Sequence, residues 1–140
     1  MRLLLDTNVL SEVTRPSPDR RVLEWLDRLD EDRTFISVVS IAEIRRGVAL
    51  RDDGRRRDAL AEWLAQELPQ RFEQRILHVD ESVALAWGDL MGIAKRRGRG
   101  LSSMDGFIGA TAIAQDLTLA TRNIKDFEGF GINLHNPWTA

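Results

Sequence analysis

Three carboxylates and one amide lie where the chain leaves its apolar runs, and they are Asp6, Glu43, Asp105 and Asn123. Two carboxylates about 4 Å apart repel each other by about 4 kcal/mol at an effective dielectric constant of about 20. A fold that gathers three of them therefore needs a cation to offset the repulsion. Oxygen donors without Cys or His suit Mg²⁺ or Mn²⁺ better than Zn²⁺. These four side chains predict a site for one of those two metals.

Each carboxylate also has a purely structural explanation. Asp6 precedes an expected helix and would cap it. Ser40 and Glu43 have the spacing of a capping box, in which the carboxylate bonds back to the start of its own helix. Asp105 lies near another helix start, where the helix dipole favours an acid. Taken singly, each explanation outweighs a metal site; taken together, the three acids favour the metal.

Secondary structure must bring these distant residues to one place. Short runs rich in apolar, β-branched and aromatic residues predict strands, and apolar residues repeating every three or four positions predict helices. The expected strands are 3–5, 34–39, 76–79, 117–121 and 132–134. The expected helices are 7–13, 20–29, 40–50, 59–69, 81–94 and 104–116, with a charged hinge at 51–58 and a turn at 123–127.

Strands that alternate with helices predict an α/β fold with a parallel sheet of about five strands and helices on both faces. In such a sheet the carboxyl ends of the strands and the starts of the following helices share one edge. The four candidate ligands are all expected at that edge. The sequence contains no repeat, low-complexity tract or linker, so residues 1–140 are expected to form a single domain.

Composition disfavours several other kinds of protein. The chain has no Cys and two His, which excludes disulfides and thiolate metal sites and argues against a zinc site built from histidines. No apolar run approaches the roughly 18 residues of a membrane span, and Asp6 interrupts the first run. We therefore expect a cytoplasmic protein with no membrane partner. The net charge of −2 argues against nucleic-acid binding by bulk charge, although cations bunch at 55–57 and 95–99.

Four stretches, in order along the chain, resemble the successive motifs of PIN domains. They are Leu4-Leu5-Asp6-Thr7-Asn8-Val9-Leu10-Ser11-Glu12, Ser37-x-x-Ser40-x-x-Glu43-Ile44-x-x-Gly47, Asp105-x-x-Ile108-x-Ala110-x-Ala112 and Thr121-Arg122-Asn123-x-x-Asp126-Phe127. The resemblance is to the bacterial VapC toxins, and the closing Asn136-Pro137-Trp138 is similar to the FitB-like subgroup. One such motif is a weak signal, whereas four in register over essentially the whole chain are a strong one.

The resemblance implies a PIN-like three-layer α/β/α fold and a ribonuclease that depends on Mg²⁺ or Mn²⁺, acting as the toxin of a toxin–antitoxin pair. It also implies a homodimer and a cognate VapB-like antitoxin that lies over the early helices and blocks the site. By motif position, Asp6, Glu43 and Asp105 are the metal ligands. Asn123 takes the family's fourth acidic position among the catalytic residues. Because an amide supplies no charge, a second metal is expected to bind weakly, or only when RNA phosphate completes its shell.

Further residues are expected to support the hydrolysis of RNA phosphodiester bonds. Those expected to orient the ligands or the metal-bound water are Thr7, Asn8, Ser11, Thr121 and Asp126. Hydrogen bonding at helix starts and turns is the alternative for these residues. Those expected to contact RNA phosphates are Arg45, Arg46, Arg96 and Arg97. A solvated helix end explains the second pair of arginines more simply.

Two other functions stay open at the level of sequence. A phospho-acceptor receiver module is also a small α/β protein with an acidic Mg²⁺-binding rim, but Asp6-Thr7 lacks the pair of acids that it requires after the first strand. A catalytically silent PIN domain that only binds other molecules is the second alternative. The departure from the acidic pattern at Asn123 keeps it open.

Overall fold

Five parallel strands form the centre of the protein in a computed structural model that describes residues 1–139. The strands are β1 (Leu3–Leu5), β2 (Thr34–Ser37), β3 (Ile76–Leu77), β4 (Thr118–Ala120) and β5 (Leu134–His135). Their order across the sheet is β3-β2-β1-β4-β5, so the first strand of the chain is the central one. Leu4 pairs with Phe35 of β2 on one side and with Leu119 of β4 on the other. The predicted parallel sheet of about five strands is confirmed.

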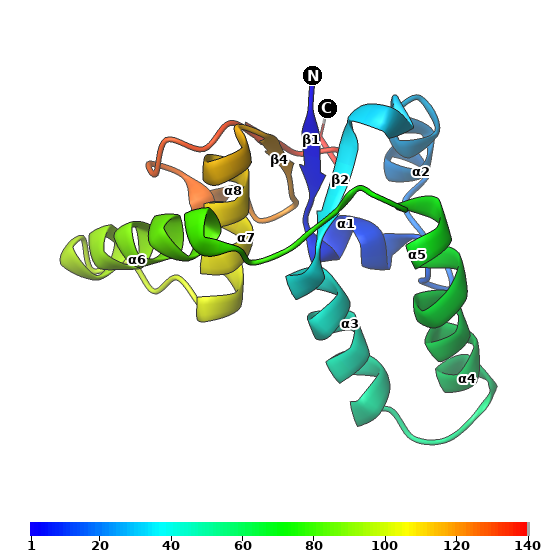
Figure 1. The fold of residues 1–140 in the computed structure, drawn as a ribbon. Coiled ribbons are helices and arrows are strands. Elements are labelled where there is room, and N and C mark those ends of the chain that lie inside the picture. The colour runs from blue at the N-terminus through cyan, green and yellow to red at the C-terminus, as the bar shows by residue number, and fades with distance from the viewer. Residues whose placement is uncertain (140) are drawn as a thin grey trace.

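Helices cover both faces of the sheet. They are α1 (Thr7–Glu12), α2 (Arg20–Asp27), α3 (Val38–Leu50), α4 (Arg55–Glu62), α5 (Leu68–Arg71), α6 (Glu81–Arg96), α7 (Ser103–Gln115) and α8 (Ile124–Phe127), with a 3₁₀ turn η1 (Glu31–Arg33) and a π-helical segment η2 (Trp63–Glu67). Figure 1 shows α2 and α5 on one side of the central strands and α6, α7 and α8 on the other. The three-layer α/β/α architecture is therefore confirmed. No helix within residues 1–139 is both long and apolar enough to cross a bilayer.

The three leucines of β1 are buried on both faces of the sheet. Leu3 and Leu5 pack in a cluster with side chains of α1, α2 and α5, whereas Leu4 packs in a second cluster with Ile108 of α7. A strand with helices on both sides reads as an unbroken apolar run, without the alternation of a half-exposed strand. This arrangement explains why the run ends abruptly at Asp6, where the strand reaches the edge of the sheet.

The junction between β2 and α3 differs from the prediction. The strand was expected to continue to Val39, with the helix starting at Ser40, but α3 begins at Val38. The N-cap is Ser37, whose hydroxyl accepts a 3.0 Å hydrogen bond from the N–H of Val39. Both Ser37 and Ser40 can cap a helix, and the earlier one does so because β2 ends there.

The fourth helical segment also begins earlier than predicted. α4 starts at Arg55, so half of the expected hinge at 51–58 is helical. The helix does not stop at Pro69 but passes through η2 into α5. Proline lacks the N–H needed for a regular helical bond, and a π-helical turn before it is one way in which a helix accommodates such a residue.

Toward the C-terminus the elements are shorter than expected. β3 ends at Leu77 and β4 covers only Thr118–Ala120. The expected turn at 123–127 contains the short helix α8, and the last strand lies at 134–135 instead of 132–134. Each of these strands still ends at the same edge as β1, because all the pairings are parallel.

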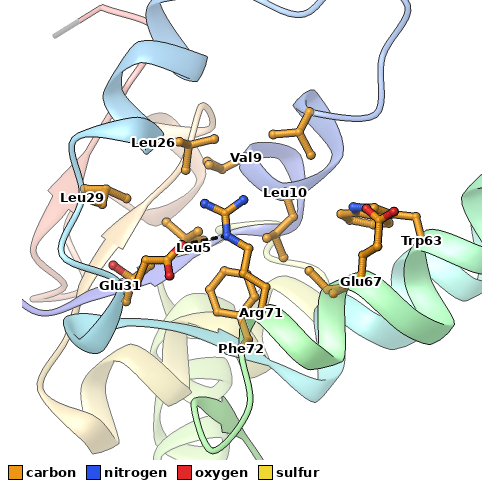
Figure 2. Close-up of a pocket in the computed structure, with 13 residues that line it drawn as sticks. Leu5, Val9, Leu10, Leu26, Leu29, Glu31, Trp63, Glu67, Arg71 and Phe72 are labelled. Atoms are coloured by element: carbon orange, nitrogen blue, oxygen red, sulfur yellow. Dashed lines mark hydrogen bonds and ion pairs between the residues drawn. The ribbon is translucent and has the colours of Figure 1, made fainter.

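An apolar cavity of about 100 Å³ lies between α1, α2, η2 and α5 (Figure 2). Leu5 and Val9 line it, and at its edge Nε of Arg71 donates to Oε1 of Glu31 at 3.1 Å. Asp6, the residue after Leu5, lines a different hollow. The junction of β1 and α1 thus separates an apolar cavity from a polar cleft.

Candidate active site

Asp6 lies at the carboxyl end of the central strand and is only 3% exposed. It caps α1, since its Oδ1 accepts a 2.7 Å hydrogen bond from the backbone N–H of Thr7. Its Oδ2 accepts a 2.7 Å bond from the hydroxyl of Thr121 and a longer one, 3.4 Å, from the amide of Asn8. The structural role as a cap therefore uses one carboxylate oxygen, while the residue after β4 holds the other.

The pKa of Asp6 is raised from 3.8 to about 6. Burial is the main cause, because it disfavours the charged carboxylate. The hydrogen bonds from Thr121 and Thr7 lower this pKa, while the negative charges of Asp105 and Glu43 raise it. Glu43 and Asp105 are thus both close enough to Asp6 to repel its charge.

Glu43 is held by Thr7 and takes no part in a capping box. Its Oε1 accepts a 2.7 Å hydrogen bond from the hydroxyl of Thr7, which also lies 2.8 Å from the hydroxyl oxygen of Ser40. The Thr7 hydroxyl has one hydrogen and a carboxylate can only accept, so we assign the second contact to the Ser40 hydroxyl donating to Thr7. Ser40 is buried within α3 and does not start it, which rules out the capping-box explanation for Glu43.

Asp105 lies in the first turn of α7, as expected. The N-cap of this helix is Ser102, whose hydroxyl accepts a 3.1 Å bond from the N–H of Asp105. The pKa of Asp105 is raised, first by burial and also by the charge of Asp126, whereas Ser102 lowers it. The helix dipole alone does not account for these surroundings, because a carboxylate placed only for the dipole would not face a second acid.

All four candidate ligands meet at one cleft of about 240 Å³. Its lining residues are Asp6, Thr7, Asn8, Ser11, Glu43, Asp105 and Asn123. Of the supporting residues, Thr121 lies fully buried behind the carboxylate of Asp6. Asp126 lies beside Asp105 in a neighbouring hollow, outside the cleft lining. The backbone N–H of Asn123 donates a 3.0 Å bond to the Thr121 hydroxyl, which joins the β4 side of the cleft to Asp6.

The cleft offers carboxylate, amide and hydroxyl oxygens, the donor set that Mg²⁺ and Mn²⁺ prefer. Within residues 1–139, no three His, Cys, Asp or Glu side chains lie close enough together to hold a metal ion as they stand. The carboxylates surround a space instead of touching one another. A cation in that space would offset the negative charges of Asp105 and Glu43, which add to the effect of burial on the pKa of Asp6, so the residues fit a divalent metal.

None of the four arginines expected to bind RNA lines this cleft. Arg45 and Arg46 are exposed on α3, and Arg96 is exposed at the end of α6. Arg97 is the C-cap of α6, and its guanidinium donates a 2.6 Å bond to the carbonyl of Gly129. This contact gives Arg97 a structural use that the sequence alone did not indicate.

A second groove, of about 450 Å³, adjoins the cleft. The lining residues that the two hollows have in common are Thr7, Ser11 and Glu43. Its wall also contains Arg15, Arg51 and Arg56, none of which the sequence had singled out for a role. Arg56 belongs to the bunch of cations at 55–57, whereas nothing in the sequence sets Arg15 or Arg51 apart.

Known proteins resemble this chain in sequence and in fold. The PIN domain family matches residues 3–131, which include every residue of the cleft. The chain belongs to the PIN-domain family. This PIN domain is 41% identical to Toxin FitB of Neisseria gonorrhoeae over 97% of its own length and 98% of the toxin's. It is 37% identical to VapC ribonuclease Y4jK of Sinorhizobium fredii over 97% of each chain.

The structural comparison agrees with the sequence comparison. The crystal structure of FitAcB from Neisseria gonorrhoeae matches this PIN domain with a TM-score of 0.92 and 40% identity, covering 99% of both chains. The predicted family is thus confirmed, and the receiver-module alternative is excluded. PIN-domain ribonucleases generally depend on a divalent metal, which agrees with the oxygen donors of the cleft.

Proposed function

We propose that this PIN domain, acting as one unit over residues 1–140, is the ribonuclease toxin of a toxin–antitoxin pair. It hydrolyses RNA phosphodiester bonds with Mg²⁺ or Mn²⁺ bound in the carboxylate cleft. The observation that carries the proposal is the meeting of Asp6, Glu43, Asp105 and Asn123, from four separate parts of the chain, around one cleft. The relatives named Toxin FitB and VapC ribonuclease support the same activity.

Asp6, Glu43 and Asp105 would hold the metal through carboxylate oxygens, and Asn123 would add its carbonyl oxygen. When bound, the metal supplies a water of lowered pKa and neutralises charge on the leaving oxygen. The hydrogen bonds from Thr121 and Thr7 keep Asp6 oriented and favour its charged form against the effect of burial.

Incubation of the purified protein with structured RNAs tests the activity. We expect cleavage with Mg²⁺ or Mn²⁺, none with EDTA, and none by the Asp6→Asn and Glu43→Gln variants with either metal. Cleavage that persists in EDTA or in Asp6→Asn would contradict the metal site. Metal that raises the melting temperature of the wild type without any cleavage would favour the catalytically silent binding module, for which Asn123 is the only sequence indication.

The proposed protein partner is a VapB-like antitoxin. Toxin FitB supports this pairing, since the structure that this chain matches is named as the FitAcB assembly. The apolar cavity beside α1 and α2 lies among the early helices, which is where the family resemblance places the antitoxin (Figure 2). The proposed location is the cytoplasm, where the RNA substrate is.

The outer face of α6 supports a homodimer. One exposed stripe of this helix carries Glu81, Leu85, Gly88, Gly92 and Arg96. In an antiparallel pair of these helices, with the two-fold axis beside Gly88, each Glu81 lies opposite Arg96 of the second copy and each Leu85 lies opposite Gly92. The stripe is thus complementary to itself in charge and in size, as a two-fold interface requires.

A further inference from the structure

The groove beside the cleft is continuous with the proposed catalytic centre. Thr7 and Glu43 stand between the two hollows and line both of them. The groove extends from there along α1, α3 and α4, as far as Leu60. Its volume of about 450 Å³ lies within the range of about 300–1,000 Å³ that is typical of ligand sites. A chain whose phosphate lies in the cleft can therefore continue into the groove.

Three arginines give the groove its positive charge. Arg51 is exposed, and the ion pairs among residues 1–139 involve neither Arg51 nor Arg56. Arg56 donates a 3.1 Å bond to the carbonyl of Thr14, which leaves other N–H groups of its guanidinium for a ligand. Arg15 pairs with the buried Glu12 at 3.3 Å, yet its side chain is 58% exposed. Against these three cations, Glu43 is the only acid of the wall.

Apolar side chains form a second part of the groove wall. Ile44, Val48 and Leu60 line it, and Leu50 lies at its edge with 69% of its surface exposed. At Gly47 an added Cβ would meet no atom within 4 Å, so the wall is open there. Sites for single-stranded nucleic acid combine cations along the backbone with surface that covers the base faces, most often aromatic side chains. In this groove the aliphatic side chains of the wall supply that surface.

We propose that this groove binds the RNA strand next to the scissile phosphate, with Arg51 and Arg56 on its phosphates and the apolar wall against its bases. The inference rests on the proposed ribonuclease function and adds the path of the substrate. It replaces the expectation that Arg96 and Arg97 carry the strand, because those residues lie on α6 and line neither the cleft nor the groove.

An acidic peptide is the other macromolecule that such a groove could hold. RNA is favoured because the groove opens directly into the carboxylate cleft, where a bound metal would receive the phosphate of a substrate. Phosphates repeat along a strand, so a strand with one phosphate at the carboxylates places others beside the arginines. A groove for a peptide needs no such continuity.

Binding of fluorescent single-stranded RNA to the Asp6→Asn protein, with Mg²⁺ present, tests the groove without cleavage. In that background we expect Arg51→Gln to weaken binding about fivefold at low salt and to reduce the salt slope by about 0.7, the value for one phosphate contact on a single strand. Arg51→Lys keeps the charge and should recover most of the affinity. Arg28→Gln, at the exposed end of α2, is the matched control and should change neither quantity.

The same substitutions in the active protein separate binding from chemistry. Arg51→Gln should raise KM for a long RNA severalfold while kcat stays within about twofold, because a contact made equally in the ground and transition states affects binding alone. An unchanged salt slope, or an equal loss in Arg28→Gln, would overturn the groove. Arg51→Gln that binds RNA normally but loses its antitoxin would assign the groove to the peptide instead. Wild-type protein that cuts no RNA would contradict the proposed function itself.

Discussion

The hydroxyl of Thr121 donates a 2.7 Å hydrogen bond to Oδ2 of Asp6, although 115 positions separate the two residues. Thr121 follows β4 and Asp6 follows β1, so the bond joins the ends of two neighbouring strands. The N–H of Asn123 donates to the same hydroxyl oxygen at 3.0 Å, which leaves its hydrogen for Asp6. Asp6 is thereby oriented from the β4 side of the cleft as well as by its own helix.

Replacing Thr121 with Val should reduce RNA cleavage by about 10- to 100-fold, the usual effect of losing a residue that orients a metal ligand. Without the hydroxyl, the pKa of Asp6 rises further above its usual range, because a bond that lowers it is gone. The pH dependence of cleavage should therefore shift to higher pH. Thr121→Ser retains the donor and should behave like the wild type; a Val variant with an unchanged pH profile would contradict this role.

A second prediction concerns the hydrogen bond that the Thr7 hydroxyl donates to Glu43. Thr7→Val should release Glu43 from α1 and weaken Mn²⁺ binding, measured by calorimetry, by about 10-fold or more. Ser40→Ala removes only the donor behind Thr7 and should have a smaller effect in the same direction. Equal effects of the two variants would contradict the larger role assigned to Thr7, whose hydroxyl alone of the two contacts Glu43.

Asp6→Asn should stabilise the metal-free protein at neutral pH. In the folded protein the pKa of Asp6, about 6, exceeds its usual value of 3.8, so the wild type loses folding stability from this group as pH rises from about 4 to 6. At neutral pH, the raised pKa of Asp6 therefore costs the wild type about 3 kcal/mol of folding stability. Asp6→Asn avoids this cost but loses about 1 kcal/mol, because its side chain has one hydrogen-bond acceptor fewer. Urea unfolding in EDTA should show the variant more stable by about 2 kcal/mol at pH 7, with the advantage disappearing toward pH 4. A difference that does not change with pH would contradict the raised pKa.

An exchange of charges tests the homodimer through α6. Glu81→Arg and Arg96→Glu each place like charges opposite each other at both ends of the stripe, so each variant alone should dimerise about tenfold more weakly. An equimolar mixture of the two variants restores both opposite-charge pairs and should dimerise like the wild type. Sedimentation velocity measures all three samples. A mixture that stays monomeric while the wild type dimerises would exclude the antiparallel packing.

Much of the site could be predicted because it lies at element boundaries. The run Leu3–Leu5 ending at Asp6 marks a buried strand and its carboxyl end, and a parallel sheet gathers such ends at one edge. The predicted start of α3 was wrong by two residues, because Ser37 and Ser40 are equally good N-caps. The length of β2, which depends on its pairing with β1 and β3, decides between them, and local sequence does not contain that information.

The groove could not be predicted, because it depends on how helices pack. Arg51 and Arg56 lie next to the cleft only because α4 returns along α3 and α1. In the sequence, the stretch that contains them predicted only a charged hinge. The RNA contacts were predicted instead on Arg45 and Arg46 of α3 and on Arg96 and Arg97 at the end of α6. Spacing along the chain identifies which face a helix buries, but the angle and side from which two helices meet follow from the whole core.

The central position of β1 sets the order in which the site is completed during synthesis. Asp6 leaves the ribosome 115 residues before its partner Thr121 and before the neighbouring Asn123. β1 gains its second neighbour only when β4 docks. A nascent chain that contains β1 but not β4 therefore carries Asp6 and Glu43 without the residues that orient Asp6, so the cleft is complete only after β4 has been made.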